Sequence, residues 1–123
     1  MKKEAKAQIE FNQYLRETGM RGFFELKQTD SETFPFAKIE KNQWEGLEAT
    51  EKNGLVWKLS DEDQRPKPCD CFSIPPLPSY LVIRFLDGFY LIRFGVILKL
   101  RDEGCISINR SVAETLAEKI IKI

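Results

Sequence analysis

Histidine is absent from this 123-residue chain, and that absence removes several kinds of chemistry at once. Ser-His-Asp and Cys-His catalysis, zinc held by imidazole and histidine acid–base chemistry all become impossible. If the protein is an enzyme, carboxylates and lysine must carry its chemistry, and we expect a hard, oxygen-preferring metal such as Mg²⁺ to assist them.

The chain also has few cysteines, no long apolar run and no excess of positive or negative charge. The three cysteines are too few for a disulfide framework or a zinc site and fit a reducing compartment. We expect Cys69 and Cys71 to be small buried residues. No apolar run approaches the ~20 residues of a membrane span, and the charged start "MKKEAKAQIE" has no signal-peptide core. The 19 basic and 19 acidic residues balance, which disfavours a non-specific nucleic-acid coat. These features predict a cytoplasmic protein without membrane contact.

The order of predicted elements indicates a single α/β (α+β) domain. Helices are predicted at 2–18, at 38–52 and from about 109–111 to 120, the last one capped by Ser111 with Glu114. Strands are predicted at 23–29, 55–60, 69–74, 80–85, 89–94 and 95–100. Asp87-Gly88 predicts a tight hairpin between two of these strands.

The stretch "RGFFELKQT", residues 21–29, places charge inside an aromatic strand. Strand side chains alternate, so Glu25 and Lys27 share one face while Phe24 and Leu26 share the other. A carboxylate can ligate Mg²⁺ and a lysine two positions on can orient water, which suits phosphodiester hydrolysis without histidine. The alternative interpretation is an exposed salt-bridged pair on a half-solvated strand.

Residues 22–59 resemble the central part of the PD-(D/E)XK nuclease superfamily, closest to RecU-type Holliday junction resolvases and small phage nucleases. In that group a strand carrying Glu-x-Lys leads into a Phe-Pro turn, a helix with a glutamine and a strand that opens on glycine. The matching residues here are Glu25, Lys27, Phe34, Pro35, Gln43 and Gly54. The resemblance implies a restriction-endonuclease-like central mixed sheet flanked by helices.

The resemblance further implies a metal-dependent endonuclease that hydrolyses phosphodiester bonds of branched DNA. Its acids would hold Mg²⁺ or Mn²⁺, and it would form a homodimer because cutting two strands symmetrically needs two sites. Phe23 stands two residues before Glu25, where such nucleases can carry an aspartate. Asp70 in "KPCDCFSI" is the best replacement, and Glu4 and Glu10 on the first helix are further candidates.

The predicted site therefore has catalytic Glu25, Lys27 and Asp70, with Glu25 and Asp70 as metal ligands. Gln28 and Gln43 are predicted to support them, and Gln28 is expected to extend the polar face of the strand beyond Lys27. Lys67 and Arg84 are predicted to contact phosphate. Asp70 has an alternative as a loop acid paired with Lys67 or Arg65. The alternative function is a catalytically inactive nuclease-fold module that binds DNA or a protein partner. A third possibility is a structural phage or mobile-element protein in which residues 21–29 are simply a strand with a polar face.

Overall fold

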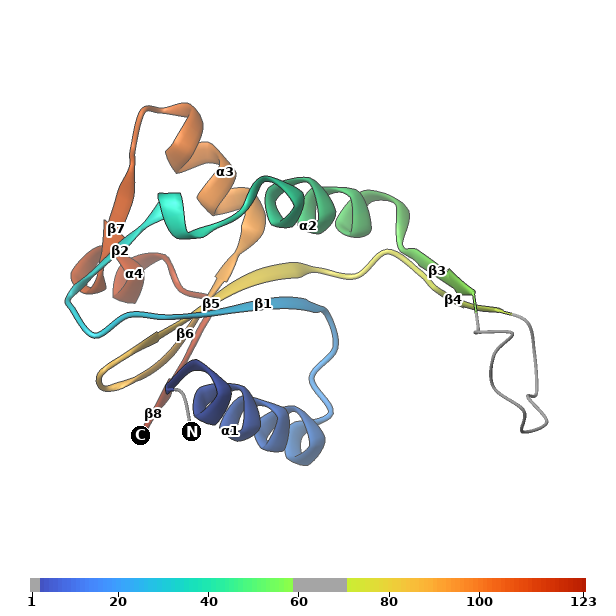
Figure 1. Ribbon diagram of the computed structural model, residues 1–123, viewed down its shortest axis with the longest axis horizontal. Helices are drawn as coiled ribbons and strands as arrows, with labels where there is room; N and C mark the ends of the chain where they lie inside the picture. The colour runs from blue at the N-terminus through green and yellow to red at the C-terminus, as the bar shows by residue number, and fades with distance from the viewer. Residues whose placement is uncertain (1–2, 59–70) are drawn as a thin grey trace.

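Four strands form the central sheet in the computed structural model of this protein, which describes residues 3–58 and 71–123. Their order is β1-β5-β6-β8. The strands are β1 (Phe23–Gln28), β5 (Ser79–Phe85), β6 (Gly88–Arg93) and β8 (Lys119–Lys122). The described residues hold four α-helices and eight strands in total, so the predicted mixed α+β class is confirmed (Figure 1).

Both directions of pairing occur in this sheet. β1 runs parallel to β5, with Phe23 opposite Ser79 and Gln28 opposite Arg84. β5 and β6 form the predicted hairpin around Asp87-Gly88, and β8 pairs antiparallel to the far side of β6. The two central strands are buried along almost their whole length, because both faces of the sheet are covered.

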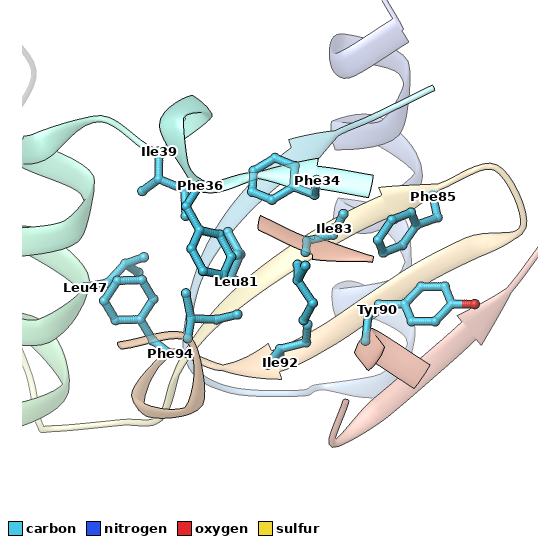
Figure 2. Close-up of a cluster of buried hydrophobic side chains, with 13 residues drawn as sticks. Phe34, Phe36, Ile39, Leu47, Leu81, Ile83, Phe85, Tyr90, Ile92 and Phe94 are labelled. Carbon is cyan, nitrogen blue, oxygen red and sulfur yellow. The ribbon is translucent and has the colours of Figure 1, made fainter. Parts of the chain in front are cut away.

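Helices cover the two faces of the sheet unequally. α1 (Lys3–Thr18) packs Ala7 and Phe11 against one face. α2 (Lys41–Asn53), α3 (Phe94–Asp102) and α4 (Arg110–Leu116) lie over the other. Figure 2 shows the larger apolar cluster on that second face, where Leu81 and Ile83 of β5 meet side chains from α2 and α3.

Two short strand pairs lie outside the central sheet. β2 (Thr33–Pro35) pairs antiparallel with β7 (Ser107–Asn109), and the 3₁₀ turn η1 (Phe36–Lys38) follows β2. β3 (Leu55–Lys58) pairs antiparallel with β4 (Cys71–Ile74). This second pair projects away from the sheet beyond the end of α2 (Figure 1).

Two predictions about the second half of the chain are wrong. Residues 95–100 are helical in α3, because Phe94 and Ile97, three apart, bury one helix face on the sheet. The predicted last helix ends at Leu116, and the segment that follows becomes β8, where Ile120 pairs with Tyr90. Its N-cap is not Ser111: the Asn109 side chain accepts the Val112 N–H at 2.8 Å.

Two expectations drawn from composition have different outcomes. Cys71 is exposed, which contradicts the expectation that it is buried, and Cys69 lies outside the described residues. Within the described residues, no helix is both long enough and apolar enough to cross a membrane.

Candidate functional site

β1 places Glu25 and Lys27 on the face of the sheet that α2 covers. Glu25 lies opposite Leu81 and Lys27 opposite Ile83, and both of these β5 residues belong to the apolar cluster beneath α2. Leu26 faces the other way and packs with α1. The predicted alternation of charged and apolar side chains along β1 is therefore confirmed. β1 is also an edge strand, so this polar pair stands at the border of the sheet.

The Glu25 carboxylate is held between an amide and an ammonium group. Gln43 donates its Nε2–H to Glu25 Oε1 at 2.8 Å, and Lys27 Nζ lies 3.7 Å from the same oxygen. The Lys27 side chain is only 13% exposed and that of Glu25 is 27% exposed. Three of the residues predicted from the sequence are thus brought together from a strand and a helix.

The start of α2 explains why Gln43 points at Glu25. Glu40 is the N-cap, and its side chain accepts the backbone N–H of Gln43. In return, Gln43 Oε1 accepts the backbone N–H of Glu40 at 2.9 Å. This reciprocal capping box fixes the amide plane, since one end of the side chain is already occupied. The other end, the NH₂ group, is left to donate to Glu25.

Burial raises the pKa of the Glu25 carboxyl above its usual value. The positive charge of Lys27 opposes that shift, whereas the negative charges of Glu4 and Glu40 add to it. Glu4 was a candidate from the sequence. Glu40 was missed, although its spacing of three residues before a glutamine is the capping-box signal that could have placed it beside Gln43.

A shallow groove adjoins this cluster. It has a volume of about 440 Å³ and runs between β1 and one side of α2. Glu25 and Gln43 form part of its wall, together with Phe23 and Leu47. Gly46 also faces the groove, and a Cβ built at this position would meet no atom within 4 Å. Glu25 and Gln43 therefore border open space on the side of Gly46.

Gln28 and Arg84 lie on the opposite face of the sheet. The two residues pair across β1 and β5, and both line a pocket of about 190 Å³ beside Lys3 and Lys6 of α1. The Arg84 guanidinium stands 5.4 Å from the centre of the Phe89 ring. The expectation that Gln28 extends the polar face of Glu25 and Lys27 is wrong, because neighbouring side chains in a strand alternate. Gln28 and Arg84 are therefore on the α1 side of the sheet, whereas Glu25 is on the α2 side.

Asp70, the predicted second metal ligand, and Lys67, a predicted phosphate contact, lie outside the described residues. Among residues 3–58 and 71–123, no three acidic or cysteine side chains gather where a metal ion could bind. Mg²⁺ commonly takes one or two carboxylates and completes its octahedron with water and phosphate oxygens. Glu25 fits one such position, and a second protein ligand would have to come from elsewhere.

Comparison with protein-family models, with curated proteins and with solved structures finds no match for this chain. The nuclease hypothesis accordingly rests on the residues of segment 22–59 and on the contacts that they make.

Proposed function

We propose that this protein is a metal-dependent endonuclease that hydrolyses phosphodiester bonds of branched DNA, in the manner of a Holliday junction resolvase. One observation carries the proposal: Glu25 is held between Lys27 and Gln43 in the wall of an open groove. A carboxylate with a neighbouring, largely buried lysine is suited to such hydrolysis in a protein without histidine, because the acid can hold a metal ion and the lysine can offset negative charge.

The three residues divide the work of hydrolysis between them. Glu25 would be one ligand of Mg²⁺ or Mn²⁺, with Asp70 as the predicted second carboxylate. A bound divalent metal supplies charge stabilisation for the phosphate and a more acidic water. Lys27 holds its ammonium 3.7 Å from Glu25 Oε1, where it can orient a water and offset developing negative charge. Gln43 fixes the carboxylate in one orientation, so Glu25 is organised before substrate arrives.

The raised pKa of Glu25 gives this proposal a pH signature. A metal ligand must be deprotonated, so protons compete with the metal wherever the carboxyl is partly protonated. Cleavage should therefore rise with pH through the folded-state pKa of Glu25, which lies above its usual value.

The experiment is cleavage of four-way junction DNA by the purified chain with Mg²⁺ or Mn²⁺. Glu25→Gln and Lys27→Met should each lower the rate by at least about 100-fold, the loss expected when a transition-state contact is removed. Asp70→Asn tests the predicted second ligand. Glu45→Gln is the matched control, because Glu45 is an exposed carboxylate on α2 whose pairing is with Lys41. Unchanged cleavage by both Glu25→Gln and Lys27→Met would refute the proposal.

A second candidate is a catalytically inactive module with the same fold that binds DNA or a protein. The observation in its favour is that the described residues supply one carboxylate beside Lys27 and no complete metal-binding group. Titration with Mn²⁺, monitored through the electron paramagnetic resonance signal of the ion, distinguishes a nuclease from an inactive module. A nuclease should bind Mn²⁺ and lose it in Glu25→Gln, whereas an inactive module should show junction binding without either effect.

A further inference from the structure

Arg84 and Arg93 each interrupt an apolar strand, and the structure gives them different surroundings. Arg93 forms an ion pair with Glu51, in which Nη2 lies 2.6 Å from Oε1. Arg84 forms no ion pair with any of the described residues. Its guanidinium donates a hydrogen bond to the Phe85 carbonyl oxygen and stands 5.4 Å from the centre of the Phe89 ring. A guanidinium has five N–H donors, so the half-buried Arg84 keeps donors and a positive charge that an anion would satisfy.

Arg84 lines a pocket between α1 and the sheet, here called the α1 pocket. Its volume is about 190 Å³, and Lys3, Lys6 and Gln28 also line it. Val82, two residues before Arg84, packs against α1, so the alternation along β5 places Arg84 on that same face of the sheet. The pocket is smaller than the ~300–1,000 Å³ of sites that take drug-sized ligands. It therefore suits one small chemical group rather than a large molecule.

Positive charge is in excess in the α1 pocket. The lining has three cations against two carboxylates, which leaves one positive charge: Lys3, Lys6 and Arg84 against Glu10 and Asp30. Lys3 Nζ lies 3.1 Å from Asp30 Oδ1, so these two charges largely cancel. Lys6 forms no ion pair within the described part of the chain, although Glu10 is one helical turn away. Lys6 from a helix and Arg84 from a strand thus border one small space as two unneutralised cations.

We propose that the α1 pocket binds a phosphate group. An arginine offers a planar fork of donors and a lysine a compact positive charge, and the oxygens of one phosphate can engage both together. A carboxylate has two oxygens in one plane and would satisfy fewer of these donors. The amide of Gln28, opposite Arg84 on β1, lines the same pocket and adds a further donor.

The phosphate site is separate from the candidate active site. Arg84 was predicted from the sequence to contact phosphate beside Glu25, but the two residues lie on opposite faces of the sheet. The proposal therefore stands independently of the proposed nuclease function. The phosphate group could belong to a small phosphorylated ligand or to the backbone of a nucleic acid, and the choice of probes distinguishes these sources.

The test is isothermal titration calorimetry of the full chain, without divalent metal, against three probes. These are inorganic phosphate, adenosine monophosphate and a short single-stranded oligonucleotide without terminal phosphates. Arg84→Gln should weaken binding at least about tenfold, the loss expected for hydrogen bonds to a charged group. Lys6→Gln should weaken it by about threefold, since Lys6 is exposed and partly screened by solvent. Because Lys6 is exposed, this second variant tests the pocket even if Arg84→Gln proves unstable by circular dichroism.

Arg16→Gln is the matched control, because Arg16 is an exposed cation in the last turn of α1, away from the pocket. Its removal changes net charge equally and should alter binding by less than about twofold. Binding of phosphate and adenosine monophosphate alone would identify a small phosphorylated ligand, and Arg84-dependent binding of the oligonucleotide would identify a nucleic-acid backbone. The proposal is overturned if no probe binds or if acetate binds as tightly as phosphate. It is also overturned if Arg84→Gln and Lys6→Gln weaken binding no more than Arg16→Gln.

Discussion

Glu25 on the β1 edge of the central sheet and Asp87 in the turn between its two central strands are both surrounded by hydrogen-bonding and cationic side chains, yet the pKa values of these two acids move in opposite directions. At the β1 edge, the pKa of Glu25 is raised. In the turn between β5 and β6, beside the β8 edge, the pKa of Asp87 is lowered. The comparison shows what each cluster is suited to do.

The difference comes from which physical effect is larger. Asp87 accepts hydrogen bonds from Lys122 at 2.7 Å and from the Tyr90 hydroxyl at 3.0 Å, and the bond from Lys122 is the main cause of its lowered pKa. Burial is the main cause at Glu25, and Lys27 at 3.7 Å only partly offsets it. The Asp87 cluster is satisfied and joins the hairpin to the C-terminal strand. The Glu25 cluster instead holds a carboxylate whose pKa is raised by burial, a perturbation that is common at sites that bind or react.

Lys27→Met should have the largest effect, because it removes the cation whose charge opposes the effect of burial on Glu25. Junction cleavage should fall by at least about 100-fold, and the pKa of Glu25 should rise further. Carboxyl chemical shifts followed by NMR across pH measure the second effect even where no cleavage is detected. An unchanged Glu25 titration would show that the difference between the pKa shifts of Glu25 and Asp87 does not depend on Lys27.

Gln43→Ala should have an intermediate effect on stability. The substitution removes the bond to Glu25 and the bond to the Glu40 backbone, and about 1–2 kcal/mol of unfolding free energy should be lost. Urea denaturation measures this loss. Asn42→Ala, at the exposed neighbouring position of α2, should change stability by less than about 0.5 kcal/mol. Equal losses in both variants would show that Gln43 is an ordinary helix-surface residue.

Asp87→Asn should have the smallest effect, less than about 1 kcal/mol at pH 7, because the group is partly exposed and screened by solvent. A lowered pKa means stabilisation that is present above the unfolded-state value of 3.8 and is lost as pH falls through the folded-state value. The difference in melting temperature between the wild type and Asp87→Asn should therefore shrink below about pH 3.8.

Glu25→Gln should show the opposite sign. The folded-state pKa of Glu25 is raised, so ionising this carboxyl costs stability as pH rises from its unfolded-state value of 4.5 through the folded-state value. The variant should gain in melting temperature relative to the wild type over that interval. If the melting temperatures of the Asp87 and Glu25 variants changed with pH in the same direction relative to the wild type, the two carboxyl groups would not have opposite pKa shifts.

Strong local signals predicted much of the fold from the sequence. The helix at 2–18 ends before Gly19, and Asp87-Gly88 marked the hairpin, as found. The segment "GVILKL" misled because it is apolar at nearly every position, so neither a helical nor a strand period is visible. Tertiary packing determines that this segment is a helix: α3 buries Phe94 and Ile97 against a sheet that the local sequence does not reveal.

In the candidate site too, features set by local sequence could be predicted, whereas contacts between distant segments could not. The shared face of Glu25 and Lys27 followed from alternation alone. The contact of Gln43 with Glu25 joins a helix to a strand, and only the resemblance indicated that these residues act together. Gln28 was misplaced because its polarity was given more weight than its position in the alternation. Glu40 was overlooked because a helix cap has no evident chemistry until the fold places it beside a buried carboxylate.

The parallel pairing of β1 with β5 also has a kinetic consequence. Strands β5 and β6 meet through a two-residue turn, whereas β1 reaches β5 only after the whole of residues 29–78 has been spanned. Closing so long a loop costs chain entropy before any contact repays it. We expect the hairpin to form early in folding and β1 to dock late. A folding intermediate would then contain most of the sheet core while Glu25 and Lys27 were still in water, so refolding should restore hairpin structure before the contacts of Glu25 with Lys27 and Gln43.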